Sequence, residues 1–222
     1  ERLASRWTAV VVAVGDGEAE EGRRRSIDAP IEVIRNPVPP GWSPRTAADR
    51  SRARAELGLP HGPIAVCVGR FSRQKGQDVL VTAWPQVRRS VPDATLVLVG
   101  DGPDLDQVRA NAGPGIQFPG PTDDPRPYLA AADIAILPSR WEGLSLSMLE
   151  AMASARSLVV TDVAGSEVVT AADSGAVVPV DDPPALAEAI ALRLGGRVDI
   201  EAEGRRGAQF VAEFHDFETE MV

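Results

Sequence analysis

Short apolar runs recur along this chain, and most of them are continuous rather than alternating with polar residues. A strand with one face in water alternates, whereas a strand buried on both faces is apolar throughout. Segments with helical periodicity separate the runs, and this rhythm predicts an α/β fold with a doubly wound parallel sheet. The predicted strands are residues 8–14, 31–34, 64–68, 95–99, 134–137, 158–161 and 176–180. The predicted helices are residues 47–57, 77–90, 105–112, 127–132, 145–155 and 184–194.

A cluster of prolines divides the chain into a short first part and a long second part. Residues 36–45 hold four prolines with Gly41 and Trp42, which is typical of an interdomain linker. Residues 1–35 are too few for a domain, and we interpret them as the end of a preceding one. Residues 46–204 form the predicted α/β domain, and residues 205–222 a C-terminal helix. The rings on one face of that helix pack either on this domain or on the preceding one; they are Phe210, Phe214 and Phe217.

Composition excludes several classes of function. The net charge of −9 argues against nucleic-acid binding, which needs a basic face. The single cysteine, Cys67, lies in an apolar run and is interpreted as a small buried residue. No metal-ligand spacing surrounds His61 or His215, so we expect no metal site. With neither a signal-peptide pattern nor an apolar run of ~20 residues, the expected compartment is the cytoplasm.

The segment after the predicted strand 64–68 carries two cations between two glycines. Gly69 and Gly76 permit tight turns, and Arg70 and Lys75 lie between them. Ligands of open α/β sheets bind at the carboxyl ends of the strands. An arginine fork grips phosphate oxygens and a lysine adds a point charge, so the pair predicts a diphosphate site. The alternative is that both are solvated loop residues.

Two carboxylates flank the start of the predicted helix 145–155. Glu142 precedes the helix, and Glu150 lies one to two turns inside it. Carboxylates accept hydrogen bonds from vicinal diols, as in ribose recognition, so the pair predicts contacts to sugar and ribose hydroxyls. The alternative for Glu150 is an exposed helix surface, although its apolar neighbours indicate an enclosed helix.

The same helix start offers backbone donors. Ser145 or Ser147 is the expected N-cap. The free N–H groups of Gly143, Leu144 and Ser145 then point toward an anion, and the helix dipole adds to the attraction.

Three other turns carry weaker signals. Gly100 and Gly102 are interpreted as a plain turn, because two glycines alone do not identify a phosphate site. Gly120 and Pro121 end a short strand and offer backbone groups to a flat base, although a simple turn is the alternative. Glu167 follows another strand and is expected to cap a helix or orient the Glu142 loop.

In this order the motifs resemble the donor-binding half of family 4 retaining glycosyltransferases with the GT-B fold. The resemblance covers about residues 8–222, and the ordered set is more specific than any single motif. The matching positions are Gly69, Arg70, Lys75, Gly76, 96–103, 118–120, Asp133, 137–139, Glu142, Gly143, 150–153 and Glu167.

The resemblance implies two Rossmann-like domains facing each other across a cleft, the C-terminal one binding a nucleotide-diphosphate sugar. It implies that Arg70 and Lys75 contact the diphosphate, that Glu142 contacts the sugar and that Glu150 holds the ribose diol. We assign catalysis to Arg70, Lys75 and Glu142. The donor-binding residues are Gly69, Gly120, Pro121, Gly143, Leu144, Ser145 and Glu150.

The resemblance also implies transfer with retention at the anomeric carbon, without a cofactor or bound metal. The acceptor is a glycan, lipid or small molecule, and its site lies in an N-terminal domain that this sequence does not include. That domain is the expected route for any peripheral contact with the inner face of a membrane. We therefore expect this piece to bind the donor weakly and not to transfer sugar unaided.

Three loops depart from the family pattern. The linker has Asn36 followed by Pro37, where the family usually has glycine, which predicts a stiffer hinge. Ala155 stands where a glycine is usual after the Glu150 helix, and Ala164 replaces the first of two usual glycines before Glu167. None of these changes removes a charged group, so we expect them to alter loop geometry rather than chemistry.

Two other functions fit parts of the sequence. One is a nucleotide-sugar epimerase of the same architecture, although neither His61 nor His215 matches the histidines on which such sites rely. The other is a non-catalytic module that binds a nucleotide sugar, since binding and catalytic groups overlap here.

Overall fold

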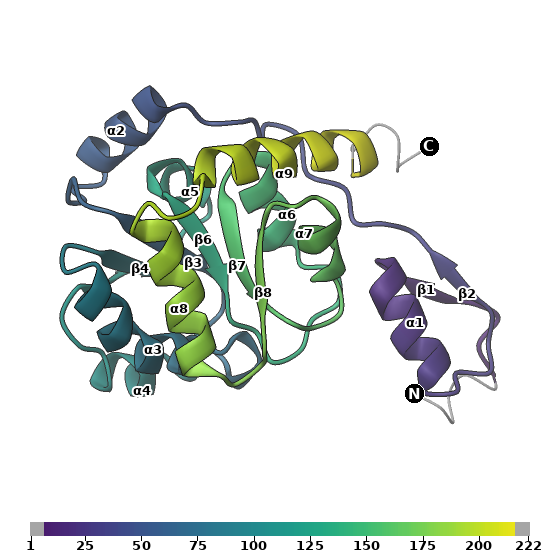
Figure 1. Cartoon of the computed structure of the whole chain (residues 1–222). Helices are drawn as coiled ribbons and strands as arrows, with labels where there is room; N and C mark the ends of the chain where they lie inside the picture. The colour runs from purple at the N-terminus through teal and green to yellow at the C-terminus, as the bar shows by residue number, and fades with distance from the viewer. Residues whose placement is uncertain (1–6, 216–222) are drawn as a thin grey trace.

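The computed structural model describes residues 7–215, in which a six-stranded parallel sheet carries helices on both faces (Figure 1). The strand order is β5-β4-β3-β6-β7-β8. This is the order of a Rossmann fold, so the predicted doubly wound sheet is confirmed. The strands are β3 (Ile64–Val68), β4 (Thr95–Val99), β5 (Ile116–Gly120), β6 (Ile134–Leu137), β7 (Ser157–Thr161) and β8 (Gly175–Val178).

The helices follow the strands in the α/β rhythm that the sequence predicts. Most lie within two residues of their predicted limits, but the last begins at Ile200 instead of residue 205. They are α2 (Ala47–Glu56), α3 (Gln77–Ser90), α4 (Leu105–Ala110), α5 (Arg126–Ala131), α6 (Leu146–Ala153), α7 (Glu167–Ala171), α8 (Pro183–Leu194) and α9 (Ile200–Phe214). Within residues 7–215, none is long and apolar enough to cross a bilayer.

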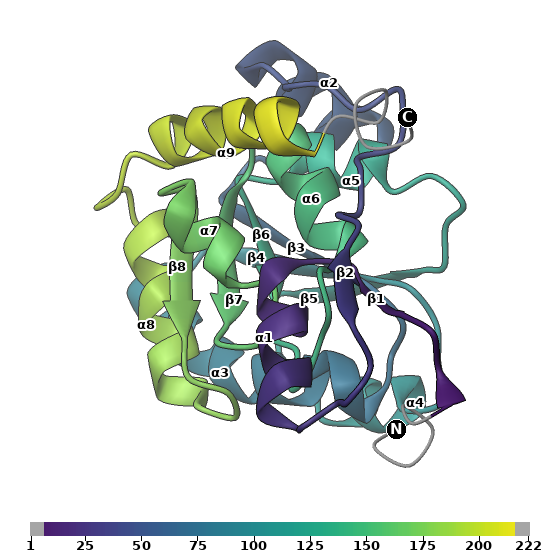
Figure 2. The same ribbon diagram turned by 90° about the vertical axis from the view of Figure 1, so that its right-hand side faces the viewer.

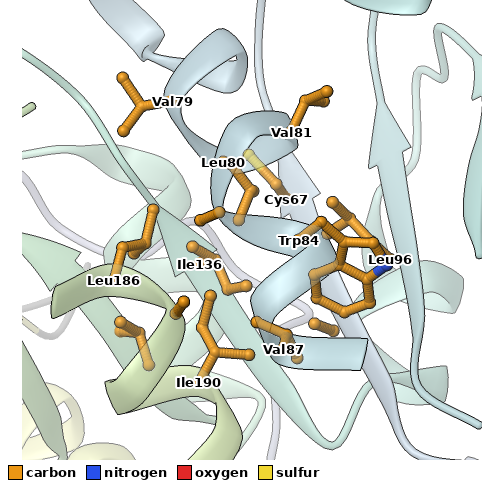
Figure 3. Close-up of a cluster of buried hydrophobic side chains, with 14 of the residues drawn as sticks. Cys67, Val79, Leu80, Val81, Trp84, Val87, Leu96, Ile136, Leu186 and Ile190 are labelled. Carbon is orange, nitrogen blue, oxygen red and sulfur yellow. The ribbon is translucent and has the colours of Figure 1, made fainter. Parts of the chain in front are cut away.

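The central strand β3 faces two separate cores, which explains its continuous apolar sequence. Ala65 and Cys67 pack toward α3, α4 and α8, whereas Ile64 and Val66 pack toward α5, α6, α7 and α9. Figure 3 shows part of the first core, where the ring of Trp84 from α3 lies among side chains of the sheet and of α8. Cys67 is buried here, and burial raises the pKa of its thiol to about 12. It is therefore a packing residue rather than a nucleophile.

The crossover between the two halves of the sheet places β3 beside β6. Ala65 pairs with Ile134 and Val66 with Ala135. The chain first winds outward from β3 through β4 to β5, and then returns to build β6, β7 and β8 on the other side. The loops after β3 and β6 therefore leave the same edge of the sheet side by side, at the point where such folds bind ligands.

A small β-α-β unit precedes the sheet: β1 (Val11–Ala13), α1 (Asp16–Arg24) and β2 (Ile31–Val33). It lies beside the larger unit, as the two views show (Figures 1 and 2). Hydrogen bonds join them: Asn36 Nδ2, just after β2, donates to the Leu144 carbonyl at 2.8 Å, and the Gly17 amide donates to Glu167 Oε1 at 2.9 Å. Glu167 thus accepts a hydrogen bond from the first turn of α1 and caps that helix, which is one of the two roles expected of it. The domain limits themselves stay a prediction.

Helix α9 covers α6 and β7 on the face of the sheet nearest the linker. Phe210 packs against the core, and its ring lies 4.7 Å from that of Phe214, centroid to centroid. Phe214 is largely exposed, and Phe217 lies outside the described residues. These two rings therefore share a face, as predicted.

The loop after α6 departs from the family pattern and holds the linker in place. Arg156 is fully buried and donates hydrogen bonds to the carbonyls of Ser154, Ala132 and Arg45, the last at 2.8 Å. Burial lowers the pKa of its guanidinium to about 10, so it remains charged at neutral pH. The residue before it, Ala155, has a left-handed backbone with φ 55°, where glycine is usual.

Replacing Ala155 with glycine should raise the free energy of unfolding by about 1 kcal/mol, because a left-handed conformation strains an alanine but not a glycine. The matched control is Ala172→Gly, at a right-handed C-cap with φ −80°. There the same substitution should destabilise by about 1 kcal/mol. Urea unfolding of both variants measures the difference. Destabilisation by both would show that the Ala155 backbone is not strained.

Candidate active site

Two side chains predicted to act together meet where the loops after β3 and β6 leave the sheet. Lys75 Nζ lies 2.5 Å from Glu142 Oε1, and both side chains are largely shielded from solvent. Lys75 ends the short 3₁₀ turn Arg73–Lys75 that follows β3, and Glu142 lies in the loop between β6 and α6. The fold thus joins a cation and a carboxylate that are 67 residues apart in the sequence.

A hydrogen-bond network fixes the Glu142 carboxylate. The buried Ser139 donates its hydroxyl to Oε1 at 2.7 Å, and Gln74 Nε2 approaches Oε2 at 3.5 Å. Thr161, at the end of β7, donates in turn to the Ser139 carbonyl. Glu142 is therefore held from three sides, and the direction of its carboxylate is set before any ligand arrives.

The backbones of the two loops touch directly. Gly76 has φ 66°, and a Cβ atom placed there would lie 2.0 Å from the Pro138 carbonyl oxygen. Beside this contact the Arg140 amide donates to the Gln74 carbonyl at 2.7 Å. Only glycine permits this approach, which brings Lys75 within reach of Glu142.

Arg140 ties the same loops to the rest of the domain. Its guanidinium donates two hydrogen bonds to Asp78 on α3, at 3.0 and 2.8 Å, and one to Asp181 at 2.7 Å. Burial alone raises the pKa of the Asp78 carboxyl, but the hydrogen bonds and charge of Arg140 outweigh burial and lower it. Arg140 therefore supports the position of Glu142 without being a predicted ligand contact.

The second predicted cation, Arg70, is exposed. It forms no ion pair with any carboxylate in the described part of the chain. Its carbonyl accepts a hydrogen bond from Gln77 Nε2 at 3.0 Å, which orders the loop. Gly69 lies under the Lys75 stem, where a Cβ atom would be 3.9 Å from Lys75 Cδ. One cation is thus paired and the other is free to meet an anion.

Helix α6 begins at Leu146 with Ser145 at the N-cap position, as predicted. The Ser145 hydroxyl lies 3.0 Å from the Ser147 hydroxyl, however, and accepts no backbone hydrogen bond, so capping by this side chain is wrong. Gly143 is partly exposed, whereas Leu144 is buried. The uncapped helix start leaves backbone donors beside Glu142, available to a ligand.

Glu150 lies on the second turn of α6 and is partly buried. Burial raises the pKa of its carboxyl, and no side chain within residues 7–215 offers it a hydrogen bond or a cation. A half-desolvated carboxylate without a partner is costly to the fold. It is therefore a candidate ligand contact, although it does not touch the Lys75–Glu142 pair.

Gly120 and Pro121 lie farther along the same edge of the sheet, at the end of β5. The Gly120 carbonyl accepts a hydrogen bond from the Gly100 amide at 3.0 Å, and the Gly69 amide donates to Val99 at 3.0 Å. This series of bonds connects the loops after β5, β4 and β3. Neither residue contacts Lys75 or Glu142, and their role toward a base stays a prediction.

No motif in the sequence points to Glu18. This residue of α1 lines a cavity of about 610 Å³ together with Glu142, Gly143 and Trp141. Its helix consists mostly of charged residues, a composition that indicates a solvent-exposed helix. Only the path of the chain, which brings α1 against the loop after β6, places Glu18 near the site.

Comparisons of this chain with known proteins show which family its sequence and fold resemble. The family described as glycosyl transferases group 1 matches residues 62–194, more than half of the chain. The GDP-mannose-dependent alpha-(1-6)-phosphatidylinositol monomannoside mannosyltransferase of Mycolicibacterium smegmatis is 33% identical over 194 residues, 77% of this chain and 48% of the relative. The alpha-maltose-1-phosphate synthase of the same organism is 33% identical over 200 residues, 82% of this chain and 51% of the relative. The chain thus spans about half the length of these curated relatives.

Solved structures agree on the fold. Sucrose-phosphate synthase from Thermosynechococcus elongatus superposes with a TM-score of 0.82 at 28% identity, over 95% of this chain and 55% of that one. The Anabaena protein HepE in complex with UDP and glucose gives a TM-score of 0.86 at 21% identity, over 98% and 62%. The second likeness concerns the fold alone.

Gly76→Ala should destabilise the protein far more than Gly58→Ala. Both glycines are left-handed, with φ 66° and 64°, but a Cβ atom at Gly58 would meet nothing within 4 Å. The strain of a left-handed alanine, about 1 kcal/mol, is common to both variants. The clash with Pro138 adds roughly 2 kcal/mol or more to Gly76→Ala alone. Denaturant unfolding measures the gap, and equal losses would refute the backbone contact.

Glu150→Gln should increase stability at neutral pH. Because the folded-state pKa of Glu150 is raised, the folded protein binds this proton more tightly than the unfolded chain does. Stability therefore falls as the pH rises from the ordinary value of 4.5 through the folded-state pKa. Glutamine removes that loss, and its advantage should vanish below pH 4.5. A variant that is less stable at pH 7 would reveal a favourable partner for the carboxylate.

Proposed function

Because the chain belongs to the glycosyl transferases group 1 family, we propose that it is the donor-binding half of a glycosyltransferase. The reaction moves a sugar from a nucleotide-diphosphate sugar to an acceptor. The observation that carries the proposal is the Lys75–Glu142 pair at the crossover between β3 and β6. Ligands of Rossmann-like sheets bind at this crossover, and a diphosphate sugar needs both a cation and a carboxylate there.

The first step of the proposed mechanism is an exchange of partners. In this structure Glu142 neutralises Lys75 at 2.5 Å. A diphosphate bound between Lys75 and the exposed Arg70 attracts both cations, and Lys75 turns from Glu142 to a phosphate oxygen. The released carboxylate, still held by Ser139, then accepts hydrogen bonds from sugar hydroxyls. Donor binding thus prepares the group that orients the sugar.

The second step is departure of the nucleoside diphosphate. As its bond to the anomeric carbon breaks, the diphosphate gains negative charge. Fixed cations aimed at that charge stabilise the transition state more than the ground state. The backbone donors of Gly143, Leu144 and Ser145 add to this effect at the start of α6. The two cations supply the neutralising charge in this proposal, without a bound metal ion.

Glu150 and the loop after β5 complete the proposed donor site. The partly buried, unpartnered Glu150 carboxylate gains hydrogen bonds from a ribose diol, which offsets the cost of its burial. The backbone at Gly120 and Pro121 faces the base. We propose retention of configuration and membership of family 4 on the motif resemblance. A guanosine diphosphate sugar is one donor to test, because a relative is GDP-mannose-dependent.

The second substrate of the proposed reaction is the acceptor. We propose that sugar transfer needs a larger protein than these residues supply, since relatives are about twice as long. The chain should therefore bind nucleotide and fail to transfer sugar unaided.

Calorimetric titration with GDP and UDP tests the donor site. Lys75→Ala should weaken binding at least about tenfold, because a charge-assisted bond to phosphate is lost. The matched control is Arg73→Ala, which removes the same charge from an exposed side chain of the same turn. It should change affinity less than about twofold, the size of a screened surface effect. Equal losses in the two variants would mean that the loop attracts nucleotide only by net charge.

A second readout separates an enzyme from a binding module. In a complete protein that contains this chain, Lys75→Ala should lower kcat by at least about tenfold if Lys75 stabilises the leaving group. A module that only senses the nucleotide sugar would lose affinity and have no turnover to lose.

A further inference from the structure

A cavity of about 610 Å³ lies between α1 and the loop after β6. Glu142 and Gly143 form one wall, and Glu18 of α1 stands on the other side. Lys75 and Arg70 do not line it. The volume falls in the range of small-molecule sites, so the space suits a second ligand beside the donor.

Glu18 is fixed with one oxygen free. The Val14 amide donates to its Oε2 at 2.8 Å, which locks the side chain at the start of α1. Its Oε1 faces Gly143, where a Cβ atom would lie 3.2 Å away. Among the residues that the structure describes, none donates to this second oxygen. Glu18 therefore presents an acceptor atom beside the loop that carries Glu142.

Trp141 supplies an apolar surface at the same place. Its residue is 52% exposed, which is unusual for a side chain that gains so much by burial. Gln74 Nε2 donates to its carbonyl at 3.0 Å and fixes its backbone. Trp141 lines this cavity and an adjoining hollow of about 830 Å³ on the other side. Its exposed indole therefore offers an apolar face to a ligand in either hollow.

The apolar face of Trp141 and the acceptor oxygen of Glu18 together suit a flat ring that bears hydroxyl groups. A pyranose or cyclitol ring has an apolar C–H face and a rim of hydroxyls. The indole of Trp141 can cover the face, and Glu18 can accept hydrogen bonds from the rim. A linear polyol has the hydroxyls but no flat apolar face.

The charges that line the cavity restrict the charge that its ligand can carry. Three carboxylates line it, but Glu21 pairs with Arg25 at 2.7 Å and Glu142 with Lys75, so Glu18 is the lining carboxylate that no cation of the described residues neutralises. A phosphate or carboxylate on the ligand would meet repulsion here, whereas a neutral or cationic ring would not.

Resting on the proposed function, we propose that this cavity selects a neutral or cationic ring-shaped polyol as the acceptor. Trp141 packs on its C–H face and Glu18 accepts hydrogen bonds from its hydroxyls. The ring then lies beside Glu142, next to the donor sugar. Neither residue belongs to the motifs that identify the donor site.

The test uses the chain saturated with GDP or UDP, titrated with methyl glucoside, myo-inositol and, as the linear counterpart, sorbitol. The two rings should bind and sorbitol should not. Trp141→Leu and Glu18→Gln should each weaken ring binding at least about fivefold, with nucleotide affinity unchanged. The controls are Trp7→Leu, at a tryptophan that is 85% exposed, and Glu20→Gln, next to Glu18 on α1 but outside this cavity. Both should bind like the wild type.

The outcomes separate this inference from the donor site. Nucleotide binding with no ring binding, or with equal binding of sorbitol, overturns the acceptor proposal and leaves the donor site standing. Ring binding that survives both substitutions also overturns it. A chain that binds neither GDP nor UDP overturns the proposed function, and the acceptor proposal falls with it.

Discussion

The ion pair between Lys75 and Glu142 is the contact on which the site depends. It exists because the strand order brings β3 and β6 together and because Gly76 lets one loop backbone press against Pro138. Ser139 and the network behind it then fix the carboxylate. A charge pair shielded from water is worth little to stability, since desolvation offsets its attraction. In the proposed function the pair keeps Lys75 and Glu142 in place, and each changes partner when a diphosphate binds.

The site also contains charged side chains that lack the partners which would stabilise the fold. Glu150 is partly buried without a partner, and Arg70 lies exposed with none in the described chain. Elsewhere buried charges have partners: Arg193 bonds Glu203 at 2.7 Å, and Arg156 donates to three backbone carbonyls. Glu150 and Arg70 thus lack partners where a ligand is proposed to bind, as expected where function costs stability.

The sequence predicted the central strands 64–68, 95–99 and 134–137 residue for residue, because strands buried on both faces read as unbroken apolar runs. It placed the start of α9 five residues late, since Glu201 and Glu203 read as a polar loop, and burial of Glu203 against α8 is a tertiary effect. Arg70, Lys75, Glu142 and Glu150 were identified by motif order. The Lys75–Glu142 contact and the position of Glu18 depend on how the loops run in three dimensions, which no local sequence pattern predicts.

A crystal structure of the chain with a bound nucleotide sugar would test the central claim most directly. The account predicts that Lys75 Nζ leaves Glu142 and lies within hydrogen-bonding distance of a diphosphate oxygen. Glu142, still held by Ser139, should then contact a sugar hydroxyl. A complex in which the nucleotide sugar lies elsewhere, or binds while the Lys75–Glu142 pair stays intact, would contradict it.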